Sequence, residues 1–162
     1  MWVEHDGLVQ PDDGTLGDGH DRDLGHHRHE RGDHVEHPDL RPGGGYTSER
    51  TALATYKAII SALGEDIPFT NVAAAEQLHA GSIEMVARAR GVALPTGPFT
   101  AAATPSTKTA ACQLGVTVER QNIAMYDTLI PEVQAYPDVA KVFTTLQSAS
   151  RDSHLPAFEK CS

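Results

Sequence analysis

Apolar residues recur every three or four positions in four stretches after Tyr46, and this spacing predicts four helices. The predicted helices cover residues 47–63, 70–90, 107–130 and 138–158. Gly64 and Gly91 act as stop signals, and residues 131–137 form a turn. A loop rich in Pro, Gly and Thr, residues 92–106, is long enough to cross a bundle. The pattern predicts an all-α fold, an antiparallel four-helix bundle over residues 46–162.

Residues 1–45 show no helical or strand period, and they hold seven of the nine histidines and nine of the fourteen glycines. We expect a disordered His/Asp/Gly-rich segment that ends in a flexible junction at residues 43–45. Three interpretations stay open. The segment is a solvated tail, a sequence translated upstream of the true start codon or in the wrong reading frame, or a tail whose histidines bind Zn, Ni or Cu.

The net charge of −9 limits the classes of molecule that the protein is expected to bind. It argues against nucleic-acid binding, because neutralising phosphates requires clustered Lys and Arg. No apolar run is long enough for a membrane span. No signal peptide is visible, so the chain as written is expected in the cytoplasm.

Ionisable residues interrupt the apolar stripes of all four predicted helices. A buried carboxylate is costly unless it is paired or binds a metal. The 27 residues from Glu49 to Glu76, and the 35 from Glu119 to His154, return the chain to the same height in a bundle. In a di-metal four-helix bundle, two helices each supply a Glu and the other two each supply a Glu-x-x-His pair. Glu76 and His79 form such a pair, but the position three before His154 holds Arg151, so the last helix lacks the carboxylate. The candidate metal ligands are Glu49, Glu76, His79, Glu119 and His154.

Other interpretations of these residues stay open. Glu49 lies in a first helical turn, where an acid also stabilises the helix end. Glu119 could form a salt bridge with Arg120 or Arg151, and His154 could be a core histidine. We expect Tyr56, Tyr126 and Arg151 to lie beside the ligands.

Three segments, SERTALATY (48–56), FTNVAAAEQLH (69–79) and SRDSHLPAF (150–158), resemble motifs of a poorly characterised prokaryotic ferritin-like domain family of unknown function. The resemblance spans about residues 46–160, although the acidic run of the family's first motif is reduced here to Glu49. It implies a carboxylate-bridged site of the di-iron or di-manganese type, with one or two Fe or Mn ions, or Zn, on the same five residues. Such a site would oxidise Fe(II) or react with oxygen or peroxide. A non-catalytic storage or sensing bundle, and a decayed site with a chelating tail, are the alternatives. Metal ions are the expected partners, and a homodimer stays open.

The two cysteines lie symmetrically about the candidate ligands. Cys112 is seven residues before Glu119, and Cys161 is seven after His154. In antiparallel helices this spacing brings the two cysteines close together. A disulfide and two reduced thiols both stay open. A disulfide would indicate an oxidising compartment, and export if the start of the chain is misassigned.

Overall fold

The computed structural model describes residues 42–161 of the chain, and these residues are helical with no strand. The elements are α1 (Pro42–Leu63), α2 (Phe69–Ala89), α3 (Lys108–Glu132), α4 (Pro137–Ala149), the π-helical turn η1 (Ser150–His154) and α5 (Leu155–Glu159). Because α4, η1 and α5 follow one another without a break, they make one rod. The prediction of four helices in a bundle is confirmed. Most of the expected disordered segment, residues 1–45, lies outside the described residues.

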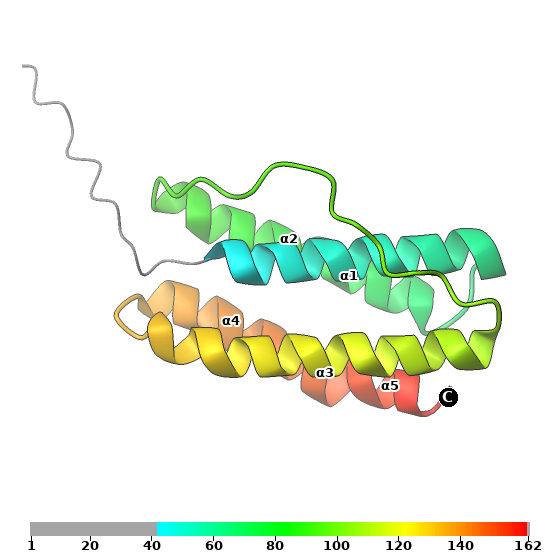
Figure 1. The fold of residues 1–162 in the computed structure, drawn as a ribbon. Coiled ribbons are helices and arrows are strands. Elements are labelled where there is room, and N and C mark those ends of the chain that lie inside the picture. The colour runs from blue at the N-terminus through cyan, green and yellow to red at the C-terminus, as the bar shows by residue number, and fades with distance from the viewer. Residues whose placement is uncertain (1–41, 162) are drawn as a thin grey trace, which may run out of the picture. The chain divides into compact units, whose positions relative to one another are not determined.

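The chain crosses the bundle once between α2 and α3 (Figure 1). α1 and α2 form an antiparallel pair, and the long connection then returns along the bundle, so α3 runs parallel to α2. α1 packs on α2 and α3, and α4 packs on the same two helices. In each of these four packed pairs the two helices run antiparallel. This is the connectivity of a bundle with one crossover.

The crossover loop is fixed against α1. The Ala102 backbone N–H donates to Thr55 Oγ1 at 3.0 Å. Phe99 packs edge-on against the Tyr46 ring at 5.7 Å, and the Arg50 guanidinium lies over Phe99 at 5.0 Å from the ring centroid. No described helix combines the length and the apolar character that crossing a bilayer requires.

The expected flexible junction at residues 43–45 is wrong, because these glycines form the first turn of α1. Pro42 suits a first helical position, where its missing N–H leaves no hydrogen bond unmade. Gly45 is buried, and a Cβ built there would lie 3.5 Å from side-chain atoms of Tyr126 and Phe143. Tertiary packing therefore outweighs the low helix propensity of glycine here.

Two apolar clusters fill the bundle. One contains Tyr46, Ile83 and Phe143 together with Tyr126, and the other contains Phe69 and Phe158 together with Tyr56. Gly115 on α3 makes room for the Phe158 ring, since a Cβ there would lie only 2.5 Å from Phe158 Cδ1. This close contact seats α5 on α3.

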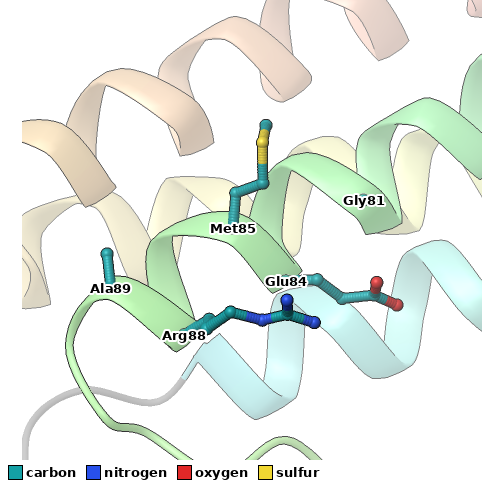
Figure 2. A pocket seen from close by; sticks show the side chains of 5 residues that line it. All are labelled: Gly81, Glu84, Met85, Arg88 and Ala89. Carbon is teal, nitrogen blue, oxygen red and sulfur yellow. The ribbon is translucent and has the colours of Figure 1, made fainter.

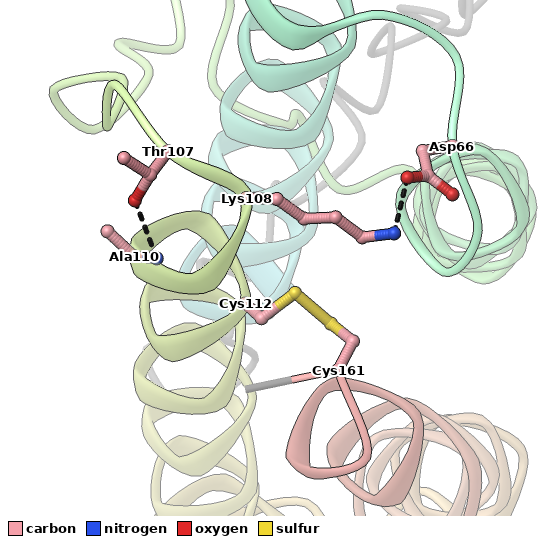
Figure 3. Close-up of a disulfide and its surroundings, with 6 residues drawn as sticks. All are labelled: Asp66, Thr107, Lys108, Ala110, Cys112 and Cys161. Atoms are coloured by element: carbon pink, nitrogen blue, oxygen red, sulfur yellow. Dashed lines mark hydrogen bonds and ion pairs between the residues drawn. A yellow bond between two sulfur atoms is a disulfide. The ribbon is translucent and has the colours of Figure 1, made fainter.

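A disulfide fixes the same end of the molecule (Figure 3). It joins Cys112 of α3 to Cys161, whose Cα atoms are 5.8 Å apart. The predicted proximity of the two cysteines is confirmed, and of the two alternatives the structure contains the bond. Close by, Thr107 caps α3 by accepting from the Ala110 N–H at 3.3 Å.

Candidate metal centre

All five candidate ligands meet in the middle of the bundle, between the two apolar clusters. The three carboxylates have no exposed surface, His154 is 6% exposed, and the His79 side chain is 12% exposed. They come from four different parts of the chain: Glu49 from α1, Glu76 and His79 from α2, Glu119 from α3 and His154 from η1.

The cluster has two similar halves that share Glu76. In one half, His79 Nδ1 lies 3.2 Å from both Glu49 Oε2 and Glu76 Oε2. In the other, His154 Nδ1 lies 3.2 Å from Glu76 Oε1 and 3.4 Å from Glu119 Oε2. The two imidazole rings stack with their centroids 5.3 Å apart. Glu76 therefore presents one oxygen to each half.

A tyrosine supports the outer carboxylate of each half. Tyr126 OH donates to Glu49 Oε1 at 2.5 Å, and Tyr56 OH donates to Glu119 Oε1 at 2.6 Å. Burial, reinforced by the adjacent carboxylate charge, raises the pKa of both phenols well above its usual value. They remain protonated donors and hold one oxygen of each carboxylate, while the other oxygen faces the imidazole. The expectation that Tyr56 and Tyr126 lie beside the candidate ligands is confirmed.

The distances suit a metal ion. Two ligand atoms that each lie about 2.1 Å from an ion can be up to about 4.2 Å apart, and the nitrogen–oxygen separations are shorter than this limit. Glu76, His79 and His154 each offer one ligand atom, and these three atoms lie within 4.8 Å of one another. Within the described part of the chain, the buried atoms Glu76 Oε1, Glu119 Oε2 and His154 Nδ1 have no hydrogen-bond partner. An ion would satisfy all three, so the residues fit a metal.

Protons stabilise the cluster when no metal is bound. Burial lowers the pKa of each imidazole, but the neighbouring carboxylates outweigh it and raise the pKa of His79 to about 10 and that of His154 to about 9. Burial, together with the Glu76 carboxylate, raises the pKa of Glu49 to about 8. Burial alone would raise the pKa of Glu76, but the Glu49 carboxyl group and the two imidazoles beside it lower it to about 2. The site attracts positive charge, whether protons or a cation.

Arg151 does not lie beside the ligands, and this expectation is corrected. Its side chain is 53% exposed, and its Nε donates to Asp152 Oδ1 at 2.9 Å. The reason is the π-helical turn, which has more residues per turn than an α-helix and changes which residues face the core. Ser150, not Arg151, is buried next to the site. The salt bridge considered between Glu119 and Arg120 is also absent, because Arg120 pairs with Glu159 at 3.1 Å.

Two buried polar residues near the ligands were not among the predicted site residues. Ser150 lies on the same predicted stripe as Phe143, Leu146 and His154, so its burial agrees with the spacing, but no role at the site was assigned to it. Asn122 lies on the α3 stripe between Glu119 and Tyr126, and it is only 1% exposed. Its position on an otherwise buried stripe was a usable signal.

A hollow on the outer side of α2 does not contain the site (Figure 2). It is lined by Gly81, Glu84, Met85, Arg88 and Ala89, none of which is a candidate ligand. Its carboxylate, Glu84, accepts a hydrogen bond from Tyr46 OH at 2.7 Å. The hollow is therefore separate from the buried cluster.

The fold also occurs in a solved structure. No protein-family model and no curated protein sequence matches the chain. The crystal structure of hypothetical protein MJ0754 from Methanococcus jannaschii DSM 2661 is similar, with a TM-score of 0.65 and 19% sequence identity. The match covers 74% of this chain and 75% of that one. At this identity the similarity shows a shared fold and carries no function.

Proposed function

We propose that the chain is a ferritin-like metalloprotein that holds up to two Fe or Mn ions on the Glu/His cluster, with Glu76 as the bridging ligand. One observation carries the proposal. The two oxygens of a fully buried Glu76 face two different imidazoles, each completed by its own buried carboxylate. An apolar core does not retain three carboxyl groups without a compensating charge.

The donor set favours Fe or Mn. Carboxylate oxygens and imidazole nitrogens suit these metals, and both cysteines are committed to the disulfide, so no thiolate is offered. Zinc accepts the same donors and is the main competitor. Three ionised carboxylates carry a formal charge of −3, which one divalent ion reduces to −1 and two ions change to +1. In the metal-free cluster the two protonated imidazoles also reduce the charge from −3 to −1, so a divalent ion would take the place of these two protons.

Bound Fe or Mn would supply one-electron chemistry towards oxygen or peroxide. The residues of the chain contribute orientation and seclusion. Tyr56 and Tyr126 hold the outer carboxylates, and the rings of Phe69 and Phe158 close one end of the site against water. The disulfide supports residence in an oxidising compartment.

Metal content tests the binding proposal. The full chain, purified without an affinity tag, is compared with Glu76→Gln, and Glu84→Gln on the exposed side of the same helix is the matched control. We expect one to two Fe or Mn per chain by mass spectrometry in the wild type and in Glu84→Gln, and a loss of most of it in Glu76→Gln. Equal metal in all three proteins would show that binding does not need Glu76 and would contradict the proposal.

A second measurement tests the redox part. The protein is loaded with Fe(II) without oxygen and then mixed with oxygen or hydrogen peroxide. We expect ferric absorbance to develop faster than with free Fe(II), and Glu76→Gln to abolish the acceleration. A protein that binds Fe(II) without accelerating its oxidation would instead be a storage or sensing bundle.

A further inference from the structure

Ser150 occupies the place where a second bridging carboxylate would be expected. The two halves of the cluster pair Glu49 with His79 and Glu119 with His154, and Glu76 stands three residues before His79. In an α-helix the matching position on the last rod would be three residues before His154. In the π-helical turn Arg151 is exposed, and the buried residue one turn before His154 is Ser150, four residues back.

The contacts between α3 and the last rod place Ser150 level with Asn122. Gln147 Nε2 donates to the Ile123 carbonyl at 3.2 Å, and seven residues later His154 Nδ1 lies 3.4 Å from Glu119 Oε2. Because the two rods are antiparallel, Ser150 lies at the level between these contacts, which is the level of Asn122. Asn122 is fixed by Ser48 Oγ, which donates to its Oδ1 at 2.5 Å.

Both residues keep a buried donor unused. Ser150 Oγ and Asn122 Nδ2 have no hydrogen-bond partner among residues 42–161. Other helical hydroxyls in the bundle behave differently, since Thr144 and Thr145 donate to the carbonyl four residues earlier at 2.8 and 2.9 Å. A buried polar group that lacks a hydrogen-bond partner destabilises the folded protein. Two such donors at one level beside a cluster of carboxylates point to a ligand that accepts hydrogen bonds.

We propose that Ser150 Oγ and Asn122 Nδ2 form a hydrogen-bonding pocket, on the side of the cluster formed by His154 and Glu119, for a small monoanion that binds the metal centre. This inference rests on the proposed function. A serine is shorter than a glutamate and carries no charge. With two divalent ions bound, the three carboxylates leave the cluster a net charge of +1, which an external anion of two or three heavy atoms would neutralise, and the two donors would fix that anion in place.

Azide binding to the Co(II)-loaded full chain tests the pocket, followed through the visible absorption of the metal. The wild type is compared with Ser150→Ala, and Ser148→Ala is the matched control, because the Ser148 hydroxyl accepts a hydrogen bond from the exposed residue Arg151. A hydrogen bond to a charged group contributes about 1.5–3 kcal/mol, which corresponds to roughly a 10- to 100-fold change in affinity. We expect Ser150→Ala to weaken azide binding by at least about tenfold and Ser148→Ala to leave it unchanged.

A gain-of-charge variant makes the test independent of lost packing. Ser150→Asp supplies the missing carboxylate, so we expect it to retain cobalt and to bind no azide. Cobalt is quantified in every sample. Wild-type protein without cobalt would overturn the proposed function and this inference together. Cobalt-loaded protein whose azide affinity is the same in Ser150→Ala, or retained in Ser150→Asp, would overturn this inference alone.

Discussion

The disulfide between Cys112 and Cys161 allows a quantitative prediction. The two cysteines are 49 residues apart, so the bond closes a loop of about 50 residues in the unfolded chain. The chain-entropy relation gives about 14 cal/mol/K for such a loop, or about 4 kcal/mol at 25 °C. Since small domains have a total stability of about 5–15 kcal/mol, we expect the bond to supply a large share of the free energy of unfolding.

Urea unfolding of the metal-free protein, followed by circular dichroism, measures this contribution. Oxidised protein is compared with protein refolded in reductant. We expect the free energy of unfolding to fall by about 4 kcal/mol, and the denaturant slope to rise, because the reduced unfolded chain exposes more surface.

The double variant Cys112→Ala, Cys161→Ala is the control for other effects of the reductant. Because this variant has no disulfide, we expect the reductant to leave its free energy of unfolding unchanged. Reduction is preferred to substitution as the main perturbation, because Cys112 is fully buried and its truncation also leaves a cavity. A difference below about 1 kcal/mol between oxidised and reduced wild type would refute the loop-closure argument.

Three further predictions concern packing, protons and ligand support. Gly115→Ala would place a Cβ against the Phe158 ring, and we expect a destabilisation of about 1–3 kcal/mol in urea unfolding; the control Gly81→Ala, with nothing within 4 Å, should stabilise by up to about 1 kcal/mol. The folded-state pKa of His79, about 10, lies above its ordinary 6.5, so the stability it contributes is complete below pH 6.5 and lost as the pH rises through 10. The melting temperature of the metal-free protein should therefore fall between pH 6.5 and 10, and saturating Mn(II), which needs neutral imidazole, should reduce the fall. Tyr126→Phe removes the donor to a ligand carboxylate, and competition with a chelator should show metal affinity reduced by about 10- to 100-fold.

The apolar period was sufficient to predict the helices, but it could not predict how α1 begins. Residues 43–45 have poor helix propensity, and only the fold reveals that Tyr126 and Phe143 pack beside Gly45. The helix propensity of these glycines disfavours a helix, whereas the packing of Gly45 stabilises one, and the packing outweighs the propensity. A single sequence shows only the local preference.

The candidate ligands could be found because carboxylates and imidazoles stand out on stripes that must be buried. The limit of this reasoning is visible at η1. In an α-helix the residues three and four before His154, Arg151 and Ser150, both lie near its face, whereas in the π-helical turn Arg151 is exposed and only Ser150 is buried. Spacing also brought Cys112 and Cys161 together, but it could not decide between a bond and two thiols, because that choice depends on the redox environment.

The crossover between α2 and α3 gives the disulfide a second role, as a check on the path of the chain. Glu119 lies near the middle of α3, so a molecule that folded with α3 reversed could still bring this carboxylate to the right height. Cys112 would then be displaced by about 14 residues, or about 21 Å along the helix axis. A disulfide cannot form when the Cα atoms are more than about 7 Å apart. Oxidation therefore locks only those molecules whose third helix runs in the native direction.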